Sequence, residues 1–162
     1  MSFDETQIRN FLSEVMDPEV PVLSILDLGI VKNIFSDEEK TEITITPTYS
    51  GCPAMKVIED GIKTKLREKG IENISIKTVY APAWTTDWIS ESGKEKLRKY
   101  GIAPPEKTTS DKNSLTGKEK KIQCPQCHSY HTEMISQFGS TACKALYKCL
   151  DCLEPFDYFK CI

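Results

Sequence analysis

The sequence contains no apolar run close to the ~18–20 residues that a helix needs to cross a bilayer. Its first residues, MSFDETQ, are polar and acidic, unlike the basic and then apolar start of a secretory signal. A broad basic surface is also missing, because Lys and Arg are scattered along a chain whose formal net charge is −3. These absences predict a cytoplasmic protein whose main partner is neither a membrane nor a nucleic acid.

Signatures of common enzymes are missing as well. The chain shows no glycine-rich nucleotide-binding loop, no hydrolase triad and no pattern of a di-iron helix bundle. Cysteine is almost absent from the first 120 residues, where Cys52 stands alone, whereas six of the seven cysteines follow residue 120. In a reducing compartment such clustering favours metal binding or thiol chemistry over structural disulfides.

Hydrophobic periodicity predicts a small α+β domain in the first part of the chain. The expected order is helix, strand, strand, helix, strand, helix, over residues 4–16, 30–35, 41–46, 53–69, 74–76 and 85–100. The first two strands would form a hairpin, and the helices would pack on one face of a mixed sheet. We therefore expect a domain at 1–103, a flexible polar linker at 104–121 and a C-terminal module at 122–162.

Four cysteines of the C-terminal module have the spacing of a metal site. Cys124 and Cys127 form one CxxC pair, Cys149 and Cys152 form a second, and twenty-one residues separate the pairs. A tight turn in each pair directs both thiolates to one point, and two pairs complete the tetrahedral coordination that zinc prefers. Four thiolates leave no position for water. The pattern thus predicts a structural zinc ribbon, in which the metal supplies much of the folding free energy of a segment of about forty residues.

Other potential metal ligands lie in the same module. His128 and His131 closely follow the first pair, and we expect them at the surface or beside the site rather than on the metal. Cys143 and Cys161 are surplus to the four ligands. Each could be a buried small residue, an alternative ligand or part of a thiol pair that handles iron or sulfide.

Aromatic residues gather in two places. Phe156, Tyr158 and Phe159 are expected to form the core of the small C-terminal module, and an exposed docking patch is the alternative. Trp84 and Trp88 lie four residues apart at the start of the last expected helix. They either pack in the core or line a pocket or a partner surface.

Cys52 lies at the junction between the second expected strand and the second helix. Because Pro53 suits the first helical position, Cys52 is expected at the N-cap, next to unsatisfied amide groups and the positive end of the helix dipole. Such surroundings favour the thiolate, which is a ligand for soft metals. The alternative is a packed small residue without a chemical role.

Longer segments of the chain resemble known families. Residues 17–30 (DPEVPVLSILDLGI) and 46–53 (TPTYSGCP) resemble the signature of the metal-sulfur cluster assembly domain shared by SufT-like proteins. Further segments are similar to the PaaD-like family of the aerobic phenylacetate pathway: residues 82–88, 100–105, 138–145 and 154–156. The resemblance extends over nearly the whole chain and includes both modules.

The resemblance implies an accessory protein rather than a catalytic subunit. PaaD-like proteins accompany phenylacetyl-CoA 1,2-epoxidase, whose oxygenase uses a di-iron site and whose reductase carries flavin and an iron-sulfur cluster. The family's reactive cysteine corresponds to Cys52 and its acidic signature to Asp17 and Glu19, and Thr48 in the Cys52 loop could donate to a bound ligand.

The same resemblance implies a cargo and partners. The cargo would be iron or an iron-sulfur cluster, bound transiently, and the partners would be the oxygenase or reductase subunits and the iron-sulfur assembly machinery. A stably bound structural subunit of the epoxidase is the alternative function. The sequence does not decide whether the chain forms a homo-oligomer. A redox enzyme that uses Cys52 is disfavoured, because the first domain has no second cysteine to resolve a disulfide.

Overall fold

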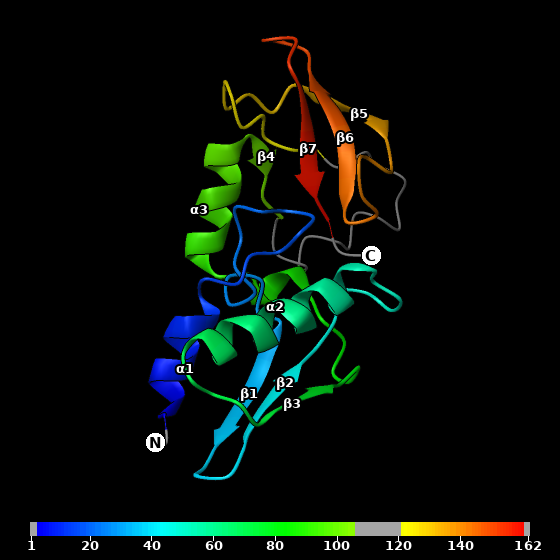
Figure 1. Cartoon of the computed structure of the whole chain (residues 1–162). Helices are drawn as coiled ribbons and strands as arrows, with labels where there is room; N and C mark the ends of the chain where they lie inside the picture. The colour runs from blue at the N-terminus through cyan, green and yellow to red at the C-terminus, as the bar shows by residue number, and fades with distance from the viewer. Residues whose placement is uncertain (1–2, 106–120, 161–162) are drawn as a thin grey trace. The chain divides into compact units, whose positions relative to one another are not determined.

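The computed structural model describes residues 3–105 and 121–160, which fold into two compact units (Figure 1). The first unit ends at Gly93 and the second begins at Lys94. Both contain β-sheet, and the helices and sheets together give the α+β fold class expected from the sequence. Within the described ranges, no helix has the length and apolar character needed to span a membrane.

The first unit contains a three-stranded mixed sheet (Figure 1). Its strands are β1 (Val31–Ser36), β2 (Thr41–Ile45) and β3 (Ile74–Thr78). β1 and β2 form the expected antiparallel hairpin, whereas β3 pairs with β2 in parallel. Thr41, Ile43 and Ile45 of β2 are buried and alternate with partly exposed residues, so one face of the sheet packs on the core.

Two helices cover this face of the sheet: α1 (Glu5–Leu12) and α2 (Ala54–Glu68). In α2, Ile58, Ile62 and Leu66 repeat every four residues and are buried, as their spacing predicts. α1 ends at Leu12 rather than at the expected residue 16. The amides of Glu14 and Val15 bond to the carbonyls three residues back rather than four, and Met16 then pairs with Ser24 in an isolated β-bridge, so the chain leaves α-helical geometry before residue 16.

The last expected helix, at 85–100, is divided into two elements. They are the 3-10 turn η1 (Thr86–Trp88) and the helix α3 (Glu91–Tyr100). Ile89 between them is extended, and the Ser90 amide donates to the Asp27 carbonyl at 2.9 Å, which draws the chain out of helical geometry. Trp84 precedes η1, so the prediction that Trp84 and Trp88 share one turn of a helix is wrong.

A four-stranded sheet forms the second unit, in the order β4-β7-β6-β5. The strands are β4 (Ile102–Ala103), β5 (Thr132–Ser136), β6 (Lys144–Cys149) and β7 (Pro155–Phe159). Phe156, Tyr158 and Phe159 are all buried, and the first two pack with Tyr147 in the core of this unit. The expectation that they form the core, rather than an exposed patch, is confirmed.

β4 explains where the two units divide. It pairs in parallel with β7, through Ile102 opposite Asp157 and Ala103 opposite Tyr158, and therefore belongs to the second sheet. The units consequently divide between Gly93 and Lys94, in the first turn of α3, rather than at residue 103 as the sequence suggested. Most of the linker expected at 104–121 lies outside the described residues.

Candidate functional site

The four cysteines predicted as metal ligands converge on one point in the second unit. Their sulfur atoms all lie within 4.8 Å of one another, with 3.7 Å between Cys124 and Cys152 and 3.5 Å between Cys127 and Cys149. A tetrahedral ion at ~2.3 Å from each sulfur would hold neighbouring sulfurs ~3.8 Å apart. The donor atoms and their spacing therefore fit a metal ion bound by four thiolates.

The two CxxC turns, or knuckles, use the same backbone arrangement. In each, the amide of the first cysteine donates to the carbonyl five residues later, at 2.8 Å for Cys124 and 3.0 Å for Cys149. The residue after the second cysteine has a positive φ in both cases, 63° at His128 and 65° at Leu153. Non-glycine residues seldom adopt this conformation, so its repetition indicates that the knuckle geometry requires it. The sequence spacing contained no signal for it.

Backbone amides also face the sulfur atoms. The amides of Cys152 and then Asp151 donate to the Cys149 sulfur and lower the pKa of that thiol to about 7. Burial and bonds to the neighbouring cysteine sulfurs raise the pKa of Cys152 to about 12, so the group of four loses its remaining protons when a metal ion binds. Cys124 and Cys149 are fully buried, whereas Cys127 is exposed, so solvent reaches the group at Cys127.

The remaining candidate ligands of this module lie outside the group of four. His128 and His131 are exposed, and Nδ1 of His131 lies 3.0 Å from a carboxylate oxygen of Asp151. Cys143 is buried, and its sulfur lies 3.0 Å from the Thr141 hydroxyl. Cys161 lies outside the described residues.

Cys52 of the first unit lies in the loop between β2 and α2. The N-cap of α2 is Pro53, not Cys52 as expected, because the Cys52 carbonyl accepts from the Met55 amide at 3.3 Å in a tighter turn that precedes the α-helix. Cys52 thus lies one residue further from the helix than the sequence indicated. Its side chain is buried, with 9% of its surface exposed.

The Cys52 loop is anchored at its start by Thr46. The Thr46 amide donates to the Ile30 carbonyl at 2.9 Å, and its hydroxyl donates to the Val79 carbonyl at 2.6 Å. Because β2 and β3 are parallel, the loops that follow them leave the same edge of the sheet. Thr48, in the first of these loops, is half-buried, and Tyr80, in the second, is 67% exposed.

The acidic signature residues shape a turn in the first unit. One carboxylate oxygen of Asp17 accepts from the amides of Glu19 and Val20, both at 2.8 Å, and Asp17 is buried. This is the turn-forming arrangement that an Asp-Pro sequence favours. Glu19 is half-buried in the same turn.

Two signature segments are joined through a contact that the sequence did not reveal. Trp84 Nε1 donates to the Leu28 carbonyl at 2.7 Å, and the Ser90 hydroxyl donates to Asp27 at 3.2 Å. Gly29 has a φ of 69°, and a Cβ there would lie 2.6 Å from the Trp88 carbonyl oxygen. Trp84 is buried, which supports its interpretation as a core residue, and glycine at position 29 was the one local signal of the close approach.

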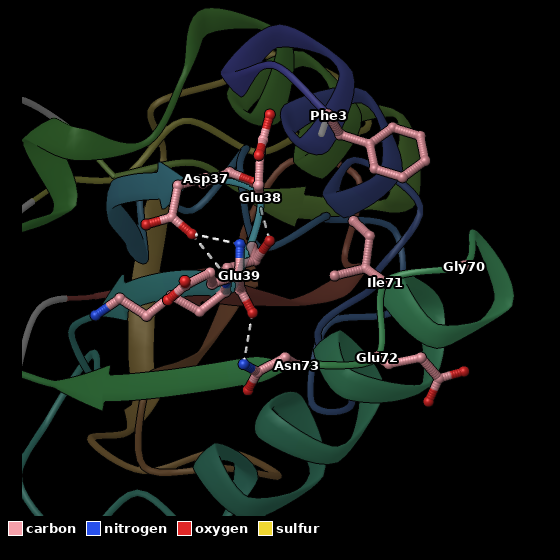
Figure 2. A pocket seen from close by; sticks show the side chains of 11 residues that line it. Phe3, Asp37, Glu38, Glu39, Gly70, Ile71, Glu72 and Asn73 are labelled. Atoms are coloured by element: carbon pink, nitrogen blue, oxygen red, sulfur yellow. Dashed lines mark hydrogen bonds between the residues drawn. The ribbon is translucent and has the colours of Figure 1, made fainter. Parts of the chain in front are cut away.

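The first unit also contains a hollow of about 240 Å³, lined among others by Phe3, Asp37 and Asn73 (Figure 2). It lies between the β1–β2 turn and the segment that follows α2. Asp37 accepts from the amides of Glu39 and Lys40, both at 2.8 Å, and the Asn73 side chain donates to the Glu39 carbonyl at 2.6 Å. These bonds hold the turn itself. The hollow adjoins the start of β2, whereas Cys52 follows its end, so the hollow is not part of the Cys52 region.

Comparisons with known proteins match each unit to a described family. Residues 5–80 match the family model of an iron-sulfur cluster assembly protein, and residues 108–160 match that of the PaaD zinc beta ribbon domain. A protein of Escherichia coli (strain K12), named as a subunit of 1,2-phenylacetyl-CoA epoxidase, is 46% identical over 156 residues, which is 96% of this chain and 92% of that protein.

Other relatives match the first unit. The Fe-S protein maturation auxiliary factor YitW of Bacillus subtilis (strain 168) is 36% identical over 92 residues, 56% of this chain and 89% of the relative. The crystal structure of a DUF59 domain from Bacillus anthracis has a TM-score of 0.54 and 30% identity, and the match covers 57% of this chain and 90% of that one.

The fold and the cysteine group define a two-module protein, in which an iron-sulfur cluster assembly domain is followed by a metal-binding ribbon. Both modules match in this order, and the relative from Escherichia coli spans both. The chain belongs to the PaaD family.

Proposed function

We propose that this chain is an accessory protein that assists delivery of iron or an iron-sulfur cluster during maturation of a phenylacetyl-CoA 1,2-epoxidase. The observation that carries the proposal is the 46% identity to the Escherichia coli relative across both modules. The first module is in addition similar to iron-sulfur maturation factors. The partners would be the oxygenase or reductase subunits and the iron-sulfur assembly machinery.

The ribbon would have a structural part in this function. Zinc is the ion that we propose for Cys124, Cys127, Cys149 and Cys152, because four thiolates in a tetrahedron are typical of structural zinc. Such an ion joins two knuckles that are far apart in sequence and stabilises a small core. With all four positions taken by sulfur, no water could be activated there.

Cys52 is the proposed transfer site, and its surroundings support a soft ligand. Residues 43–55 and 78–86, which include the two loops at this edge of the sheet, contain no Asp, Glu, Lys or Arg. The Cys52 sulfur is therefore the strongest ligand for iron that these loops offer. The oxygen of Asp17 that accepts two amides serves the turn, and Glu19 belongs to the same turn. We assign the half-buried Thr48 as a hydroxyl donor to the cargo.

A stably bound structural subunit is the second candidate function. It is favoured by the name of the Escherichia coli relative, which describes that protein as a subunit. The two functions differ in lifetime of association. A maturation factor acts before turnover and leaves, whereas a subunit stays at fixed stoichiometry during turnover.

The experiment that tests the transfer function replaces Cys52 by alanine in cells that make the epoxidase. Cys143→Ala is the matched control, because Cys143 is also a buried cysteine outside the group of four but lies in the other unit. We expect Cys52→Ala to leave the fold and the metal content intact, at a stability cost of ~1 kcal/mol, while the epoxidase gains less iron and less activity. The control should retain activity.

Wild-type epoxidase activity and iron content with the Cys52→Ala protein would refute the transfer function. Co-purification with the oxygenase at a fixed ratio throughout turnover would then favour the structural subunit.

A further inference from the structure

Two residues of the ribbon, one in each knuckle, stand two positions after a cysteine of the group of four. Ser129 follows Cys127 by two residues, and Asp151 follows Cys149 by two. The backbone amide of each donates to the sulfur of that preceding cysteine. These two sulfur atoms are 3.5 Å apart. The Ser129 and Asp151 amides thus flank the same pair of sulfurs from opposite knuckles.

The side chains of these residues also bond to each other, together with His131. The Ser129 hydroxyl donates to one oxygen of the Asp151 carboxylate, and His131 Nδ1 lies 3.0 Å from the other. The His131 amide donates to the Ser129 hydroxyl at 3.0 Å. One carboxylate therefore binds two side chains from the opposite knuckle. We refer to Ser129, His131 and Asp151 as the interknuckle clamp.

The clamp lies where the metal site is most open. Cys127 is the exposed member of the four, while Cys124 and Cys149 are fully buried. A competing chelator, or water, would therefore first replace a thiolate at Cys127. Opening of the site there requires the Cys127 and Cys149 sulfurs to separate, and the bonds between Ser129 and Asp151 resist that separation.

We propose that Ser129, His131 and Asp151 are positioning residues that slow the loss of metal from the four-cysteine site. The clamp acts on the ribbon whatever the first module delivers, so the inference goes beyond the proposed function. Exposed pairs of charged side chains usually contribute little to stability. This network differs because it is attached through backbone amides to the ligand sulfurs, and outer-shell partners of this kind change metal affinity by ~10–100-fold.

The test measures zinc release from the full-length, zinc-loaded protein into excess chelator, followed with a chromogenic zinc indicator. We expect Asp151→Asn and Ser129→Ala each to release zinc about 10-fold faster than the wild type, at the lower end of the outer-shell range because the clamp is exposed. Ser129→Ala retains the carboxylate and removes one hydroxyl, so it decides the question if Asp151→Asn fails to fold.

Glu154→Gln is the matched control. Glu154 follows Cys152 by two residues, its amide also donates to the preceding cysteine's sulfur, and its exposed side chain lies outside the clamp. It should release zinc at the wild-type rate, which separates the clamp from a general effect of charge near the metal. Equal acceleration by Glu154→Gln and Asp151→Asn would overturn the inference.

The double variant Ser129→Ala with Asp151→Asn gives a second readout. Because the two side chains share one hydrogen bond, the double variant should release zinc less than tenfold faster than Asp151→Asn alone. If the increase in the zinc-release rate of the double variant equals the product of the two single increases, Ser129 and Asp151 do not act through one shared clamp. Release rates of both single variants within twofold of wild type would also overturn the proposal.

Discussion

Replacement of Gly29 by alanine is expected to destabilise the first unit by about 3 kcal/mol, from two separate causes. Gly29 has a φ of 69°, and a non-glycine residue in this left-handed region costs ~1–2 kcal/mol. The new Cβ would also lie 2.6 Å from the Trp88 carbonyl oxygen and 2.9 Å from the Trp88 Cβ, so backbone must move. Overpacking of this kind costs a further ~1–3 kcal/mol.

Urea unfolding followed by tryptophan fluorescence isolates the effect on the first unit. The chain has two tryptophans, Trp84 and Trp88, and both precede the boundary at Gly93. With an m value of ~1–2 kcal/mol/M, a loss of about 3 kcal/mol lowers the urea midpoint by roughly 1.5–3 M. The midpoint, rather than the amplitude, is the measurement, because the substitution alters the surroundings of Trp88.

Gly70→Ala is the control for the backbone cost alone. Gly70 has a φ of 89°, but no atom lies within 4 Å of a Cβ built there. The free energy of unfolding of this variant should fall only by the ~1–2 kcal/mol that a non-glycine residue costs in the left-handed region. Equal losses in the two variants, or a Gly29→Ala loss below about 1 kcal/mol, would refute the conclusion that close packing at Trp88 joins the two signature segments.

Further predictions concern the metal, pH and the core. Metal analysis of the purified chain should find close to one zinc per four-cysteine site, and Cys124→Ser should lose both the zinc and the fold of the ribbon; an iron-sulfur absorption band without zinc would contradict this. The hydrogen bond from Lys65 lowers the pKa of Glu14 below its ordinary value of 4.5. The stabilisation of the fold by the Glu14–Lys65 ion pair is therefore present above pH 4.5 and is lost as the pH falls through the folded-state pKa of Glu14. Glu14→Gln should accordingly lower the urea midpoint at pH 7 and lower it less at pH 3. Trp84→Phe leaves the buried Leu28 carbonyl without its 2.7 Å hydrogen bond and should lower the free energy of unfolding by ~1–3 kcal/mol. A change in that free energy below about 0.3 kcal/mol, measured by calorimetry, would contradict the contribution of this bond.

Local patterns in the sequence were sufficient for the elements that depend on near neighbours. The four-residue repeat of Ile58, Ile62 and Leu66 predicted α2, because a helix brings residues at this spacing onto one face. The duplicated CxxC spacing predicted the convergence of Cys124 and Cys149 for a similar reason, since a metal site requires ligands that short turns can direct to one point.

Features that depend on distant hydrogen-bond partners were decided only by the tertiary structure. The chain leaves helical geometry after α1, where Met16 pairs with Ser24, and the last helix is divided because Ser90 bonds to Asp27, sixty-three residues away. The assignment of the segment after Gly93 to the second unit depends likewise on the pairing of β4 with β7. No local pattern contains such partners.

The surroundings of the two cysteine sites were likewise decided by contacts that form only in the folded chain. Sequence placed Cys52 beside α2, but its exact position was set by a tight turn to Met55, with Pro53 as the cap. Spacing predicted that the four cysteine sulfurs converge, but it did not reveal that Ser129 and Asp151 meet across the knuckles. Ligand spacing is a property of short turns, whereas contacts between turns exist only after the chain has folded and brought them together.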